Sequence, residues 1–164
     1  MPEPKPYVFL DSNVIFSGIY SSKGAPAMIL ERFIEGSLMV VVSRQVLDEV
    51  IRTIKEKLPE ALPALRKLLV NAPPEIRNDP TAEEVKHWSG LLDIGDAAIM
   101  AAAVAAQPDY FVTGDRHFID NPEVVKKAGL QIVTPAQFIE AWAREAGHEE
   151  REKRNQLRRP KNDT

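Results

Sequence analysis

The chain has 164 residues and no cysteine, and its formal net charge is −3. This length suits one domain with a substantial core, and the absence of thiols excludes disulfides and thiolate metal sites. No apolar stretch reaches the about 18 residues of a membrane-spanning helix, and the start "MPEPKPY" does not resemble a signal peptide, so we expect a cytoplasmic protein with no membrane partner.

The first half of the chain predicts alternating strands and helices. Pro26 suits the first turn of a helix and Gly36 suits its C-cap, while the β-branched run before Ser43 is typical of a strand covered on both faces. In residues 44–58, apolar side chains recur at the spacing of one face of a helix. We predict a strand at 7–10, a loop containing Gly18 and Gly24, a helix at 26–36, a strand at 37–43 and a helix at 44–58 capped by Ser43.

The second half continues the alternation. Thr81 and Glu84 have capping-box spacing, and Asp93 can cap a helix whose body is almost entirely apolar and therefore buried. We predict helices near 61–71 and at 81–88, 97–106, 121–129 and 136–147, a loop at 72–80, and strands at 109–115 and 130–135. The pattern indicates an α/β fold with a mainly parallel sheet of four or five strands.

The C-terminal end differs in charge from the rest. Residues 1–150 hold 15 basic and 22 acidic side chains, whereas residues 151–164 hold six basic and two acidic ones. We predict one domain over residues 1–147 and a charged tail over residues 148–164, which frays or extends the last helix. Only this tail offers a positive surface to a polyanion.

Four acidic residues, scattered in sequence, are predicted to meet at one end of the sheet. Asp11 and Asp115 each end a strand, Asp96 begins the apolar helix, and Glu49 lies near the start of the helix after the second strand, next to Asp48. In open parallel sheets ligands bind beyond the carboxyl ends of the strands. Clustered carboxylates favour a hard divalent cation such as Mg²⁺ or Mn²⁺, and the matching chemistry is phosphodiester hydrolysis.

Each of these acidic residues also has a purely structural explanation. Asp11 can form a turn or a helix cap, Asp93 can be an N-cap, and Asp96 gains from the macrodipole of its helix. Glu49 on a helix flank is ordinarily a solvated charge, and periodicity does not choose it over Asp48. The functional interpretation depends on the fold, because the order of strands and helices places Asp11, Asp96 and Asp115 at the same end of the sheet.

With these positions identified, the sequence resembles a PIN domain, the small nuclease fold of VapC-type toxins. The resemblance runs through "VFLDSNVIFSG", "SRQVLDEV", "DIGDAAIMAAA", "DYFVTGDRHF" and "IVTPAQFIEAW". It implies a Rossmann-like three-layer sandwich, a Mg²⁺ or Mn²⁺ centre and endoribonuclease activity. It also implies that the catalytic and metal-binding residues are Asp11, Glu49, Asp96 and Asp115.

The resemblance further implies supporting residues and partners. Asn13 orients Asp11 or its water, and Ser12 and Thr113 add hydroxyl contacts. His117 stands where many relatives carry another acidic residue, so it either contacts a phosphate or is a surface histidine. A toxin of this family is expected to act on RNA, to bind a cognate antitoxin and to form a homodimer.

Two other functions stay open from the sequence. A haloacid dehalogenase-like phosphatase also has an aspartate after its first strand, but it needs a second acid two residues later, where this chain has Asn13. A PIN fold that has lost activity could persist as an RNA- or partner-binding module. Metal binding separates this inert module from an enzyme.

Overall fold

The computed structural model describes residues 5–158, except for the side chains of residues 148 and 149. In this part of the chain a central five-stranded sheet has the order β3-β2-β1-β4-β5, and every neighbouring pair is parallel. The strands are β1 (Tyr7–Leu10), β2 (Met39–Ser43), β3 (Glu75–Arg77), β4 (Tyr110–Val112) and β5 (Ile132–Val133). The predicted α/β fold with a parallel sheet is confirmed.

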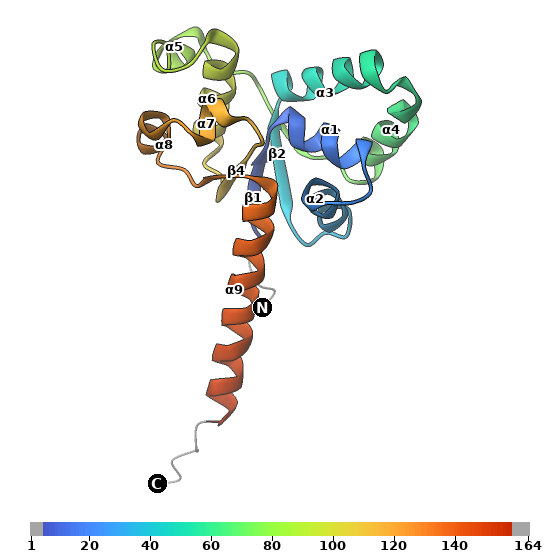
Figure 1. Ribbon diagram of the computed structural model, residues 1–164, viewed down its shortest axis with the longest axis vertical. Coiled ribbons are helices and arrows are strands. Elements are labelled where there is room, and N and C mark those ends of the chain that lie inside the picture. The colour runs from blue at the N-terminus through green and yellow to red at the C-terminus, as the bar shows by residue number, and fades with distance from the viewer. Residues whose placement is uncertain (1–4, 159–164) are drawn as a thin grey trace.

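Helices cover both faces of the sheet and give three layers (Figure 1). The helices α1 to α4 lie on one side and α5 to α8 on the other, and α9 packs against α2, β4 and β5. They are α1 (Ser12–Tyr20), α2 (Ala25–Ile34), α3 (Arg44–Lys57), a 3₁₀ turn (Pro59–Ala61), α4 (Leu62–Asn71), α5 (Ala82–Lys86), α6 (Ile94–Ala106), α7 (Arg116–Ile119), α8 (Pro122–Ala128) and α9 (Pro135–Arg158).

The strand order reverses between the two central strands. From β1 the chain builds outward to β2 and β3, and it then crosses back to β4 on the other side of β1. Adjacent loops therefore diverge at the carboxyl ends of β1 and β4, which leaves a crevice where parallel sheets bind ligands. The core of the sheet is mainly aliphatic but includes a group of three rings, in which Phe111 contacts Phe9 and Phe118 edge-on.

Several local predictions agree with the structure. Ser43 caps α3 through the backbone N–H of Val46, and Thr81 and Glu84 form a reciprocal capping box on α5. The apolar helix α6 is buried along most of its length because neighbouring elements cover it on nearly every side.

The loop predicted after β1 is wrong, because residues 12–20 form α1. Asp11 caps this helix, and Val14 and Ile15 bury its inner face. Gly18 is not a loop residue: a Cβ there would lie 2.6 Å from Leu30 Cδ1 and 2.9 Å from the carbonyl oxygen of Pro26. The glycine therefore allows α1 and α2 to pack closely.

The loop predicted at 72–80 contains the short edge strand β3. Its residues are all exposed and pair in parallel with β2, with Ile76 opposite Val42. A strand this short and exposed has no alternating apolar pattern, so its pairing depends on the neighbouring strand rather than on its own sequence.

The last helix is longer than the predicted 136–147, and it projects from the body (Figure 1). It reaches Arg158, so the described part of the predicted tail extends the helix, while residues 159–164 lie outside the described chain. None of the described helices is both long and apolar enough to cross a bilayer.

Candidate metal centre

Asp11 lies at the point where the strand order reverses. Its backbone N–H donates to the carbonyl of Val112, 3.0 Å away, and so joins the ends of β1 and β4. Its carboxylate is only 3% exposed. It accepts hydrogen bonds from the N–H of Ser12 (2.8 Å), the hydroxyl of Thr113 (2.7 Å) and the amide of Asn13 (3.3 Å). The side chain is therefore held rigidly from both strands.

Burial raises the pKa of Asp11 to about 6, because the charged form loses hydration. Hydrogen bonds from Thr113 and Ser12 act in the opposite direction. The nearby carboxylates of Glu49 and Asp115 raise the pKa further. In the metal-free protein the carboxylate of Asp11 thus lies in a site that disfavours its negative charge.

Glu49 reaches the same site from α3. The Ser12 hydroxyl donates to Glu49 Oε2 at 2.9 Å, so Ser12 contacts Asp11 through its backbone and Glu49 through its side chain. Asp48 is exposed and lines a different part of the surface, together with Arg52 and Lys55. The structure therefore distinguishes the two neighbouring acids that helical periodicity could not.

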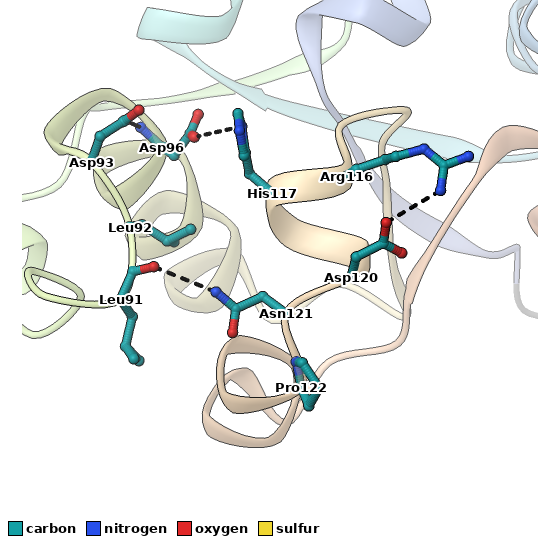
Figure 2. A pocket seen from close by; sticks show the side chains of 9 residues that line it. All are labelled: Leu91, Leu92, Asp93, Asp96, Arg116, His117, Asp120, Asn121 and Pro122. Atoms are coloured by element: carbon teal, nitrogen blue, oxygen red, sulfur yellow. Dashed lines mark hydrogen bonds and ion pairs between the residues drawn. The ribbon is translucent and has the colours of Figure 1, made fainter.

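Asp96, Asp115 and His117 form a second group of polar atoms beside Asp11. One ligand atom from each of these residues lies within 4.8 Å of the other two. His117 Nδ1 is 3.1 Å from Asp115 Oδ1 and 3.5 Å from Asp96 Oδ2, and Figure 2 shows Asp96 and His117 facing one another. Burial, followed by the charges of Asp93 and Asp115, raises the pKa of Asp96, and His117 opposes that rise.

Two supporting residues connect the loops that carry these carboxylates. Asn13 Oδ1 accepts the N–H of Gly114 at 3.0 Å, and Thr113 Oγ1 accepts the N–H of Asp115 at 3.0 Å. Thr113 is completely buried and also donates to Asp11. Its single hydroxyl therefore fixes the position of Asp11 relative to Asp115.

Helix N-termini surround the carboxylates. Asp11 caps α1, Asp96 lies in the first turn of α6, and Asp115 caps α7 by accepting the N–H of His117 at 2.9 Å. The positive ends of the macrodipoles of α1 and α6 stabilise negative charge in this position. Asp93 caps α6 through the N–H of Asp96 (2.9 Å), as its sequence position predicts.

This set of donors suits a divalent cation. Ligand atoms of Asp96, Asp115 and His117 lie within 4.8 Å of one another, the carboxylates of Asp11 and Glu49 are close enough to interact with this group through their charges, and the chain has no thiol. The carboxylates of Glu49 and Asp115 each raise the pKa of both Asp11 and Asp96, so a cation would relieve mutual repulsion within the group. Hard ions such as Mg²⁺ and Mn²⁺ prefer oxygen ligands of this type.

Comparison with known proteins identifies the fold. A model of the PIN domain family matches residues 7–117. The chain belongs to the PIN domain family. No curated protein sequence matches it.

Two solved structures share the fold of this PIN domain. One is VapBC2 from Rickettsia felis, bound to a DNA fragment from their promoter: identity is 18%, the TM-score is 0.56, and the match covers 78% of this chain and 98% of that one. The other is PAE2754 from Pyrobaculum aerophilum: identity is 16%, the TM-score is 0.59, and the match covers 85% and 90%. At these identities the likeness concerns the fold alone.

The sequence did not reveal a pocket that adjoins the carboxylates of this PIN domain. Its volume is about 360 Å³, and it lies between the turn before α6 and the segment around α7 (Figure 2). The Asn121 amide donates to the carbonyl of Leu91 at 3.4 Å and joins its two walls. The lining is Leu91, Leu92, Asp93, Asp96, Arg116, His117, Asp120, Asn121 and Pro122. Because these residues come from two segments that are separate in sequence, 91–96 and 116–122, no sequence motif predicted the pocket.

Proposed function

We propose that this PIN domain is a metal-dependent endoribonuclease that hydrolyses phosphodiester bonds of RNA. One observation carries the proposal: four separate segments bring Asp11, Glu49, Asp96 and Asp115 to the crevice where the strand order reverses. Such a concentration of carboxylates is costly for a folded protein without a bound cation. Membership of the PIN family, together with this group, supports nuclease chemistry.

Asp11, Glu49, Asp96 and Asp115 are the proposed ligands of Mg²⁺ or Mn²⁺, and His117 offers a further ligand atom next to Asp96 and Asp115. When bound, the ion would supply positive charge that stabilises the transferring phosphate and would assist attack by water. Thr113, Ser12 and Asn13 would hold the ligands in place through the hydrogen bonds described above. Their role is orientation rather than direct contact with the phosphate.

The environment of Asp11 does not favour the phosphatase alternative. A phosphatase of that class uses its first aspartate as a nucleophile, but here both carboxylate oxygens accept hydrogen bonds and the residue is almost fully buried. Asn13, which takes the place of the second acid, donates a hydrogen bond to Asp11 and accepts one from the N–H of Gly114.

The test is incubation of the purified protein with a mixed pool of structured RNAs in Mg²⁺, in Mn²⁺ and in a chelator. We expect metal-dependent cleavage in the wild type and at least about a hundredfold less in Asp11→Asn and Asp96→Asn, since each removes a charged ligand. Asp48→Asn is the matched control, because it removes a neighbouring charge outside the site. Full activity in both site variants would contradict the assignment of the site.

The inert-module alternative gives a different outcome. A module that only binds RNA or a partner would show no cleavage under any condition and no calorimetric signal with either ion. Binding of metal with no cleavage would instead indicate an enzyme whose RNA target was absent from the pool.

We further propose that the protein acts in the cytoplasm as the toxin of a toxin-antitoxin pair. The fold it shares with VapBC2 supports this setting. A cognate antitoxin would then place a basic side chain among the carboxylates, and the toxin would form a homodimer. Light scattering of the purified protein, alone and with a co-expressed antitoxin, would measure both assemblies.

A further inference from the structure

Four arginines form a row along the solvent side of α9. They are Arg144, Arg151, Arg154 and Arg158, and we call them the arginine row. At 100° per residue all four fall within an arc of about 80° on the helix surface. The acidic residues whose side chains are described in the same stretch, Glu145, Glu150 and Glu152, lie outside that arc, whereas Glu140, one turn before Arg144, lies in line with it.

The opposite side of α9 faces the body of the protein. Phe138 is completely buried there, with its ring tilted by 30° against that of Trp142, and Glu145 accepts a hydrogen bond from the Tyr110 hydroxyl at 2.8 Å. These contacts fix the rotation of the helix. The arginine row consequently points away from the body, and all four of its side chains are exposed.

The row carries little compensating negative charge. Arg144 has a long ion pair with Glu140 at 3.8 Å. No carboxylate of the described residues lies within ion-pair distance of Arg151, Arg154 or Arg158. Residues 1–150, which include Arg144, are acidic overall, with 22 acidic and 15 basic side chains. The row is thus a concentrated positive surface on an otherwise negative protein.

We propose that the arginine row binds the phosphate backbone of the RNA substrate outside the cleft, by which we mean the crevice that holds the carboxylates. This inference rests on the proposed ribonuclease function, which supplies the RNA. From Arg144 to Arg158 the row is about 21 Å long, enough to contact several consecutive phosphates. Guanidinium groups bind phosphate oxygens in bidentate geometry, and an acidic body needs such an anchor to hold a polyanion.

The position of the row sets a requirement on the length of the RNA. Helix α9 begins after the carboxyl end of β5, at the same end of the sheet as the carboxylates, and runs away from that end (Figure 1). The arginines lie about 14–35 Å along the helix from its first residue. Only an RNA long enough to span this distance can occupy the cleft and the row together. A short oligonucleotide can occupy the cleft alone.

The experiment compares RNA binding by the wild type and by a variant with Arg144, Arg151, Arg154 and Arg158 all changed to Gln. Fluorescence anisotropy is measured with a labelled RNA of about 25 nucleotides, in chelator to prevent cleavage, between about 50 and about 200 mM KCl. The matched control changes Arg52, Lys55, Arg66 and Lys67 to Gln, four exposed basic residues of α3 and α4. Both variants change the net charge equally.

We expect the row variant to bind at least about tenfold more weakly at low salt and to lose about 3 from the slope of log K against log salt. The control variant should change neither value much, and Arg→Lys at the four row positions should retain most of the binding. With metal, the row variant should cleave a very short oligonucleotide as fast as the wild type does. Circular dichroism verifies that the helix is retained.

Equal weakening by the row and control variants would overturn the inference, since net charge rather than position would explain binding. Tighter binding of duplex DNA than of RNA of the same length would also overturn it. If the row variant loses RNA binding while the wild type cleaves no RNA and gives no calorimetric signal with either ion, then the proposed nuclease function fails while the RNA-binding surface stands.

Discussion

Asp11 combines two roles that are usually separate. Its carboxylate caps α1 and also belongs to the group of acids proposed to bind metal. The cap stabilises negative charge, whereas burial and the neighbouring carboxylates destabilise it. The raised pKa shows that the destabilising effects prevail in the metal-free protein.

We predict that Asp11→Asn stabilises the metal-free protein at pH 8. Asp11 has a folded-state pKa of about 6, above its ordinary value of 3.8, so the folded state binds the proton more tightly than the unfolded state does. Its favourable contribution is complete below pH 3.8 and is lost as the pH rises through 6. Above pH 6, ionisation of Asp11 costs the folded state about 3 kcal/mol, and the variant avoids this cost. Its weaker hydrogen bonds to Thr113 and Asn13 offset about 1–2 kcal/mol of that gain.

Urea unfolding in chelator at pH 8 and pH 4 measures this difference. The variant should be more stable by about 1–2 kcal/mol at pH 8, and the advantage should disappear toward pH 4. An advantage that stayed constant with pH would mean that ionisation of Asp11 is not its source.

At the residue scale, the sequence predicted which acids lie close together but not all of the hydrogen bonds that hold them in place. The order of motifs located Asp11, Asp96 and Asp115, because each follows a strand or begins a helix. Choosing Glu49 over Asp48 needed the resemblance, since both lie on the flank of α3. The hydroxyl of Thr113 bonds to Asp11 and to the backbone of Asp115. The first of these bonds joins the ends of two strands that are distant in sequence, so composition and spacing could not predict it.

At the scale of elements, the contact between α1 and α2 depends on one glycine. Gly18 lies inside α1, where alanine would have the higher helix propensity. The close approach of Leu30 and of the Pro26 carbonyl leaves no room for a Cβ. Packing therefore overrides local preference at this position.

We predict that Gly18→Ala destabilises the protein by about 1–3 kcal/mol, because α1 and α2 must move apart. Gly147→Ala is the matched control: Gly147 is also helical, and a Cβ there would meet none of the described residues of other elements within 4 Å. That variant should be neutral or more stable by up to about 1 kcal/mol. Thermal unfolding of both would decide, and equal effects would argue against the packing explanation.

The same glycine explains why the sequence failed at α1. In a single sequence, two glycines after a strand predict a loop, and only the tertiary contact shows that one of them serves helix packing. By contrast, the caps of α3, α5 and α6 were predictable because capping is local. The edge strand β3 was missed because its pairing with β2 is the main source of its structure.

At the scale of the whole molecule, the proposed metal site exists only when the chain is folded. Its acids come from the segments that follow β1 and β4, from the second turn of α3 and from the first turn of α6. An unfolded chain does not bring them together, so an ion should bind the native state preferentially and stabilise it.

We predict that Mg²⁺ or Mn²⁺ stabilises the wild type by about 2.7 kcal/mol at a hundred times its dissociation constant. Asp96→Asn should lose most of this gain, and Asp48→Asn should keep it. Thermal unfolding as a function of ion concentration provides the measurement. Equal stabilisation of all three proteins would indicate general screening of charge rather than a site.

The hydrogen bonds of Asp11 also have an evolutionary consequence. A codon for aspartate becomes one for asparagine by a single base change, and asparagine is an equally good helix cap. Such a replacement would remove a charge from the proposed metal site while leaving the surface of α9 unchanged. If both proposals hold, one point mutation would then separate a ribonuclease from a non-cleaving RNA-binding protein with the same fold.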